Sequence, residues 1–442
     1  MRTRLTLFLM LILFTTALWS SPAAAGPPPK YFVDESKLPF EPIPGLDAEQ
    51  YWGVKNGAGY RIEVPTNWNG ELVVWAHGFR GDGLELTVDN HPIRPWLLAN
   101  GYAWAASSYS KNDYDIAQGA KDTHALTKQF NGIVSKPSRV YLTGASMGGH
   151  ITGVAIEQWP KTYDGAMPIC GVMGDYDLFD YFLDFNVVAQ ALSGQNLDFP
   201  VPDDYLVNAV PTIKSNLEIF PGTFPFTLNS QGEQLKGMTM MRSGGDRPVF
   251  DQGFLFWNGV AGDFLFGFGT GDGTLPRSPG VAVDNVDRVY QFDTDPALSA
   301  AEIALNDSVL RVEKDAQGRH KNGLANVPPV NGDIRIPVLS YHTLGDLFVP
   351  FSMQQVYAQR VAANNSSDLL VQRAVRDFGH CTFTGEELVA GFSDLTNWVE
   401  NGVKPAGDDV LDPIAVADPN FGCAHTSSDR LYPAPISIPA CP

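Results

Sequence analysis

Short runs of apolar residues alternate with longer segments of helical periodicity along much of the chain. Apolar and β-branched runs predict strands, and apolar positions that recur every three or four residues predict helices. The predicted strands cover residues 60–64, 71–76, 102–109, 139–142, 164–171, 336–342 and 369–375. The predicted helices cover residues 90–100, 115–134, 147–159 and 385–398, and a further helix begins at Phe351. This alternation favours an α/β fold with a mainly parallel sheet and helices on both faces, whereas residues 30–58 predict an irregular lead-in.

The pattern changes over residues 175–332, which are longer than an ordinary crossover between strands. This stretch contains aromatic runs such as residues 254–257 and 264–268, separated by Pro-rich and Gly-rich turns. We interpret it as an inserted cap or lid over the C-terminal edge of the sheet, where it would build a pocket and exclude water. Taken singly, each aromatic side chain is better explained as part of the core of the cap itself. Residues 26–174 and 333–442 would then form the main domain.

The N-terminus has the organisation of a secretory signal peptide. Arg2 and Arg4 precede an apolar run over residues 5–19, and three alanines at 23–25 supply a small-residue cleavage site. The apolar run is shorter than the roughly 20 residues that span a bilayer, which favours cleavage over anchoring. We therefore expect residues 1–25 to be removed and the remaining protein to be secreted and extracellular.

Composition narrows the choice of partners. Without residues 1–25 the chain has 28 Lys and Arg against 49 Asp and Glu, which is a formal charge of −21. Such a charge repels nucleic acids and anionic membranes, so neither is an expected partner. The aspartates at 284, 287, 293 and 295 do not have the spacing of a twelve-residue calcium loop. We expect no metal and no cofactor. The oligomeric state stays open.

The chain has four cysteines, an even number that favours two disulfides in an exported protein. Three pairings are possible. Cys423 and Cys441 both lie in the Pro-rich tail, where a bond between them would hold a loose end. The pairing that we favour is therefore Cys423–Cys441 with Cys170–Cys381.

One motif indicates chemistry. The predicted strand at 139–142 leads into Gly144-Ala145-Ser146-Met147-Gly148, and a helical segment follows at once. A Gly-x-Ser-x-Gly sequence between a strand and a helix is typical of a nucleophile elbow, which exposes the serine on a sharp turn. The glycines leave room for that turn, and the helix directs its N-terminal amides toward the serine.

Three further motifs accompany the elbow: His77-Gly78-Phe79 after an early strand, Gly345-Asp346-Leu347-Phe348-Val349-Pro350, and Phe378-Gly379-His380. Together with the order Ser, Asp, His along the chain, they resemble the α/β-hydrolases, specifically secreted serine esterases and amidases. The resemblance covers roughly residues 55–174 and 333–402 and leaves out the insertion. It implies that the main domain is a catalytic domain.

The resemblance also implies roles. Ser146 would be the nucleophile, His380 the general base and Asp346 the acid that orients the imidazole. The backbone amides of Phe79 and Met147 would form the oxyanion hole. Four other residues compete less well for these roles: we interpret His77 and His342 as structural, Asp377 as a weaker acid candidate, and His150 as turned away from Ser146.

The implied function is a serine hydrolase that cleaves carboxylic esters through an acyl-enzyme. The sequence leaves three alternatives open. An amidase or peptidase could use the same triad, and secreted polyester depolymerases also carry a Ser-Met-Gly-Gly elbow. A catalytically inactive binding protein on this fold is least favoured, because the triad residues and both glycine-containing loops are present. The substrate would be a small-molecule or polymeric ester or amide.

Overall fold

The computed structural model describes residues 30–441 apart from 221, 224–226, 269–280, 317, 320–326, 429 and 433. The expected signal peptide at 1–25 lies outside these described residues. Among them, no helix combines the length and the apolar composition that crossing a membrane requires.

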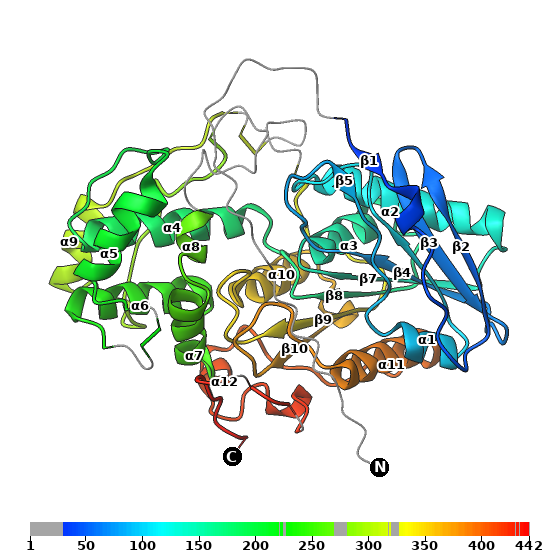
Figure 1. Cartoon of the computed structure of the whole chain (residues 1–442). Coiled ribbons are helices and arrows are strands. Elements are labelled where there is room, and N and C mark those ends of the chain that lie inside the picture. Colours follow the sequence, from blue (N-terminus) through cyan, green and yellow to red (C-terminus); the bar gives the residue numbers. More distant parts are fainter. Residues whose placement is uncertain are drawn as a thin grey trace, which may run out of the picture.

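An eight-stranded sheet forms the centre of the molecule (Figure 1). Its strands, from one edge to the other, are β10 (Leu370–Val375), β9 (Val338–Thr343), β8 (Gly165–Ile169), β7 (Arg139–Ala145), β4 (Glu71–Ala76), β6 (Ala103–Ser107), β3 (Ala58–Pro65) and β2 (Ala48–Lys55). The pairs β2–β3 and β3–β6 are antiparallel, and the other neighbours are parallel. The short strands β1 (Phe32–Val33) and β5 (Glu85–Leu86) pair separately. The predicted α/β class with a mostly parallel sheet is confirmed.

Helices cover both faces of the sheet, and strand β4 shows why. Leu72 and Val74 belong to one apolar core, while Val73 and Trp75 belong to the core on the other face, as the period of two in a strand requires. The first core also contains residues of α2 (Ile116–Ile133), α3 (Met147–Gln158) and α10 (Ser352–Ala363). The second contains residues of α1 (Arg94–Ala99) and α11 (Gly385–Asn401). Figure 1 shows the two helical layers on either side of the strands.

The expectation of an irregular lead-in over residues 30–58 is wrong, because β2 occupies most of its second half. This strand is at the sheet edge and is half exposed, so its apolar alternation is weak. It is paired through a two-residue turn in which Asn56 (φ 53°) and Gly57 (φ 85°) both have positive φ, with Lys55 opposite Ala58. Asn-Gly is a strong hairpin signal for such a turn, and this signal could have identified the strand.

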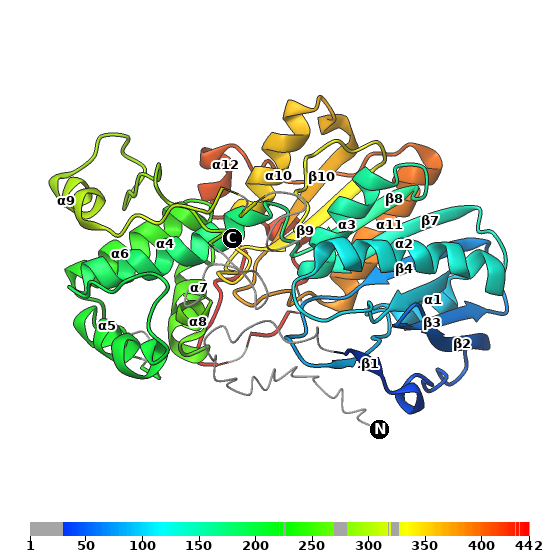
Figure 2. The same ribbon diagram turned by 90° about the horizontal axis from the view of Figure 1, so that it is seen from above.

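In the described part of the insertion, six α-helices gather beside the sheet rather than on either face of it (Figures 1 and 2). They are α4 (Tyr176–Leu192), α5 (Val210–Asn216), α6 (Ser230–Ser243), α7 (Phe250–Leu255), α8 (Phe264–Gly267) and α9 (Ala300–Ser308), with π-helical turns η2 (Tyr205–Ala209) and η3 (Phe256–Val260). Helix α4 is buried along almost its whole length. Phe254, Trp257 and Phe266 of the predicted aromatic runs are buried, and they belong to the same apolar core as α2 and α3 rather than to a separate core of the insertion.

The tail beyond Gly402 is mainly irregular, as predicted, apart from α12 (Pro413–Ala417) and the 3₁₀ turn η5 (Cys423–His425). It is nevertheless well packed. Val410, Phe421 and Ile436 join an apolar cluster with Leu344 and Phe378, which belong to the loops that follow β9 and β10. The tail therefore packs against the loops that follow β9 and β10.

Candidate active site

Ser146 lies on the sharp turn between β7 and α3, with the unusual backbone angles φ 58° and ψ −122°. The two glycines of the motif are required by close packing. A Cβ atom at Gly144 would lie 2.2 Å from the carbonyl oxygen of Gly148, and one at Gly148 would lie 2.0 Å from the carbonyl oxygen of Ala76. Any larger residue would force α3 away from the ends of β4 and β7, so the local sequence builds the elbow.

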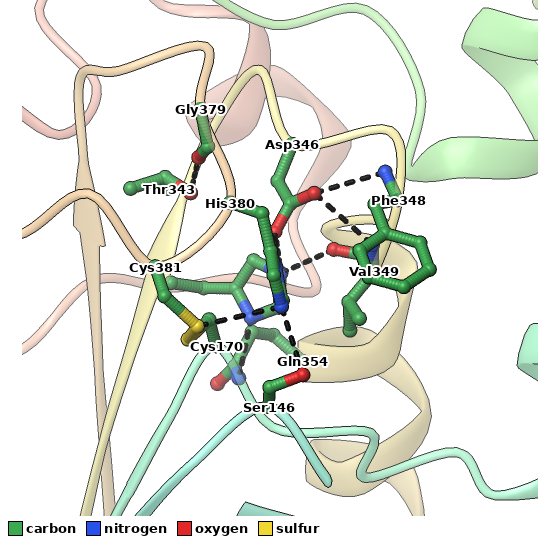
Figure 3. The surroundings of a disulfide bond; sticks show 11 residues. Ser146, Cys170, Thr343, Asp346, Phe348, Val349, Gln354, Gly379, His380 and Cys381 are labelled. Carbon is green, nitrogen blue, oxygen red and sulfur yellow. Dashed lines mark hydrogen bonds and ion pairs between the residues drawn. A yellow bond between two sulfur atoms is a disulfide. The ribbon is translucent and has the colours of Figure 1, made fainter. Parts of the chain in front are cut away.

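His380 lies in the loop between β10 and α11, and its ring lies between Asp346 and Ser146 (Figure 3). Its Nε2 is 2.8 Å from the Ser146 Oγ, and its Nδ1 is 2.6 Å from the Asp346 Oδ2. With its proton on Nδ1, the ring would donate to the carboxylate and Nε2 would be free to accept the serine proton. The side chain is 15 % exposed, and the Asp346 side chain is fully buried.

Asp346 follows β9 in a tight turn that fixes its carboxylate. The Oδ1 atom accepts hydrogen bonds from the backbone N–H groups of Phe348 (2.9 Å) and Val349 (3.0 Å), which leaves Oδ2 for His380. Backbone donors of this kind stabilise the ionised carboxylate. The structure thus brings together all three residues predicted for the triad.

The two predicted oxyanion donors belong to segments that adjoin Ser146. A Cβ atom at Gly78 would be 3.3 Å from the Ser146 Cβ, so the loop that carries Phe79 runs directly beside the serine. Among the described residues, no hydrogen bond uses the backbone N–H of Phe79. Met147 is the first residue of α3, where a helical amide has no partner one turn earlier. Both amides are therefore placed where they could serve a ligand.

The residues that competed for catalytic roles have other partners. The His77 Nδ1 is 2.7 Å from the Gly78 carbonyl oxygen, and the ring stacks on Tyr109. His150 lies between the Tyr114 hydroxyl (3.0 Å) and the Pro328 carbonyl (2.9 Å), in the core. Burial lowers the pKa of His77 to about 3 and that of His150 to about 4, so both rings are neutral.

Asp377 and His342 contact the loops that carry His380 and Asp346. Asp377 forms an ion pair with Arg430 and accepts a hydrogen bond from the Gly379 N–H (2.7 Å), so it braces the histidine loop. His342 is buried under the acid loop, with Nε2 2.7 Å from the Val349 carbonyl oxygen and 4.0 Å from the Asp346 Oδ2. Burial lowers the His342 pKa to about 4, so Nε2–H donates to Val349 while Nδ1 accepts from Gln354 (3.2 Å).

The disulfides have the pairing that we favoured, Cys170–Cys381 and Cys423–Cys441. The first joins the end of β8 to the histidine loop, and the Cys381 Sγ is 3.5 Å from the His380 Nε2 (Figure 3). Cys170, Cys381 and His380 are close enough to suggest a metal site. Because both sulfurs are in the disulfide, neither offers the thiolate that a metal ion requires.

An aromatic group beside His380 was not assigned from the sequence. The Phe348 ring meets the His380 ring edge to face, with centroids 4.9 Å apart. Four rings of the insertion surround Phe348 at 4.7–6.1 Å, and with it they form what we term the aromatic cluster: Phe182, Trp257, Phe264, Phe268 and Phe348. The aromatic runs at 254–257 and 264–268 were the available signal, but which rings face the triad depends on long-range packing.

The chain has distant similarities to known proteins. No protein-family model matches the chain. It is 24 % identical to the o-phthalyl amidase of Xanthobacter agilis, over 84 % of this chain and 91 % of that protein. Two similar solved structures are the feruloyl esterase B of Aspergillus oryzae (14 % identity, TM-score 0.39, 80 % of each chain) and an esterase of Pyrococcus furiosus (10 % identity, TM-score 0.39, 85 % of this chain and all of that one).

The strand order and the positions of the loops identify the fold. Ser146 follows the central parallel strand β7, Asp346 follows β9 and His380 follows β10, so all three residues meet at the carboxyl ends of the strands of one sheet. By its sheet order, its crossovers and the place of Ser146, this chain has the α/β-hydrolase fold.

Proposed function

We propose that the protein is a serine hydrolase that cleaves carboxylic ester bonds through an acyl-enzyme intermediate. The observation that carries this proposal is the continuous hydrogen-bonded array from the Asp346 carboxylate through the His380 ring to the Ser146 hydroxyl, with contacts of 2.6 and 2.8 Å. A serine hydroxyl is a weak nucleophile at neutral pH and needs such a base.

The reaction would proceed in two halves. His380 Nε2 takes the hydroxyl proton as Ser146 Oγ attacks the carbonyl carbon, and Asp346 stabilises the resulting imidazolium. The amides of Phe79 and Met147 would bind the developing oxyanion, and one such donor typically contributes about 3 kcal/mol in other enzymes. His380 then returns the proton to the leaving alcohol. Water then attacks the acyl carbon and gives a proton to His380. The ring passes this proton to the Ser146 Oγ as the C–Oγ bond breaks, which releases the acid and restores Ser146.

We further propose that residues 175–332 form the cap of this site and that the aromatic cluster receives an aromatic group of the substrate. Phe348 contacts His380, and three rings of the insertion lie within 5.9 Å of Phe348. Aromatic rings in edge-to-face and offset arrangements attract one another beyond simple burial, which favours an aromatic acyl group over an aliphatic one.

An amide is the second candidate substrate. Its support is the similarity to an o-phthalyl amidase over most of both chains. The same triad serves both bonds, but an amine leaves only after protonation, so His380 must act as an efficient acid. Matched aromatic esters and anilides with the same acyl group would separate the two candidates by their relative kcat/KM.

We also propose that the protein is exported. Two disulfides among the described residues support this location, since such bonds persist mainly in oxidising compartments. The predicted signal peptide supplies the route. Edman sequencing of the secreted protein should start near Gly26.

The proposed function is tested by replacing the nucleophile. We expect Ser146→Ala to abolish hydrolysis of p-nitrophenyl benzoate and labelling by a fluorophosphonate probe, a fall of about 10⁶-fold in kcat as in other serine hydrolases. Ser340→Ala is the control, because that buried hydroxyl has no hydrogen-bond partner among the described residues. Full activity of Ser146→Ala, or a probe adduct on another residue, would disprove the proposal.

A further inference from the structure

One side chain of the insertion contacts both loops that carry the acid and the base. Trp257 lies in η3 and is only 5 % exposed. Its indole Nε1–H donates to the Phe378 carbonyl at 2.9 Å and to the Gly345 carbonyl at 3.2 Å. Gly345 immediately precedes Asp346, and Phe378 lies two residues before His380. A single N–H group therefore bridges the acid loop and the histidine loop.

Other residues of the insertion near Trp257, from Arg247 to Gly253, also contact the loop that carries Asp346. The Arg247 Nε donates to the Leu344 carbonyl at 2.7 Å, so the insertion binds both carbonyl groups that precede Asp346. A Cβ atom at Gly253 would lie 2.3 Å from the Gly345 carbonyl oxygen. Val249 has φ 71°, a conformation that is strained for a β-branched residue and persists only where the surroundings impose it.

The two loops also touch each other directly. The Gly345 N–H donates to the Asp377 carbonyl at 2.8 Å, and the Thr343 hydroxyl donates to the Gly379 carbonyl at 2.7 Å (Figure 3). Trp257 closes this arrangement from the side of the insertion. Without its N–H, two buried carbonyl groups would lose a donor, and the loops could separate to recover one.

We infer that Trp257 is a positioning residue. By binding the Gly345 and Phe378 carbonyl groups, it keeps Asp346 and His380 within hydrogen-bonding distance of each other. This inference rests on the proposed function, because the positioned groups are its acid and base. The insertion would then be part of the catalytic framework as well as a cover for the substrate. A displacement of about 1 Å at a catalytic group can cost roughly 100-fold in rate, so the effect of this one N–H can be measured.

The experiment compares two tryptophans. Trp257→Phe removes the N–H and keeps an aromatic ring. The control Trp68→Phe makes the same chemical change at an indole that donates to the Glu71 carbonyl (2.8 Å), at the amino end of β4 and thus at the other end of the strands from Ser146. For Trp257→Phe we expect kcat to fall about 10- to 100-fold with KM within threefold of wild type, and fluorophosphonate labelling to slow in parallel. The low-field proton signal of the His380–Asp346 hydrogen bond should weaken only in this variant.

A second variant keeps the inference testable if Trp257→Phe fails to fold. Gly253→Ala keeps the indole, but the new methyl group would displace the Gly345 carbonyl. We expect this variant also to slow labelling of Ser146. Its control is Gly132→Ala in α2, where a methyl group would have open space around it. Wild-type labelling rates in the Trp257→Phe variant, or in Gly253→Ala if only that variant folds, would overturn the inference. Absence of labelling at Ser146 in the wild-type protein would instead overturn the proposed function.

Discussion

At the scale of single residues, the site depends on how each polar group is satisfied. The Asp346 Oδ1 accepts hydrogen bonds from two backbone amides, and Oδ2 lies 2.6 Å from the His380 Nδ1. This division makes the carboxylate a rigid acceptor that selects one tautomer of the imidazole. Asp377, the rival acid, is occupied by Arg430 and the Gly379 amide.

This division predicts the effect of Asp346→Asn. An amide nitrogen facing Nδ1 would favour the wrong tautomer, and serine proteases with the equivalent change lose about 10⁴-fold in kcat. We expect a loss of that order, with native circular dichroism. Asp377→Asn serves as the comparison and should retain most activity while lowering stability. If Asp377→Asn were the inactive variant and Asp346→Asn the active one, the assignment of the acid would be wrong.

At the scale of elements, the turn at Ser146 depends on the close packing of β7 against α3. Strand β7 and helix α3 approach so closely that Gly144 and Gly148 have no room for a side chain, and α3 also packs on the end of β4. The strained backbone at Ser146 is therefore held by its neighbours on both sides, as strain at functional positions requires.

We predict that Gly148→Ala destabilises the protein by about 1–3 kcal/mol, the usual effect of overpacking, because the new methyl group would meet the Ala76 carbonyl at 2.0 Å. Urea unfolding measures the change. Gly132→Ala, a helical glycine without close neighbours, should instead be neutral or stabilising by up to about 1 kcal/mol. Equal stabilities for the two variants would contradict the packing argument.

At the scale of the whole molecule, buried histidines link stability to pH. Among the described residues, burial lowers the pKa of six histidines, to about 3 for His77 and His91 and to about 4 for His124, His150, His342 and His425. Below pH 6.5 these histidines bind protons in the unfolded chain but stay neutral in the folded protein. Their contribution to the free energy of unfolding is therefore lost as pH falls from about 6.5 toward 4. Burial raises the pKa of Asp180 to about 6, which acts in the opposite direction.

His150→Gln isolates one contribution. We expect the loss of unfolding free energy between pH 6.5 and 4.5 to shrink by on the order of 2–3 kcal/mol relative to wild type. Because Asp180 is unchanged, its contribution cancels in this difference. Between pH 7 and 8 the two proteins should show parallel stabilities. An unchanged slope below pH 6.5 would show that His150 is not the neutral, buried group described above.

Local patterns in the sequence predicted much of the fold, because periodicity and turn chemistry depend on neighbouring residues. The strand, Gly-x-Ser-x-Gly and helix around Ser146 could be recognised in this way, and so could the parallel sheet. The edge strand β2 was missed although Asn56-Gly57 marked its turn, because a half-exposed strand alternates weakly.

The tertiary structure decided what the sequence left open. Ser146 and His380 are 234 residues apart, and the indole of Trp257 reaches a carbonyl 121 residues away. Such contacts arise from packing between elements, which no local periodicity reports. The order of strands brings the loops after β7, β9 and β10 to one edge, and only that arrangement turns separate motifs into a hydrogen-bonded array.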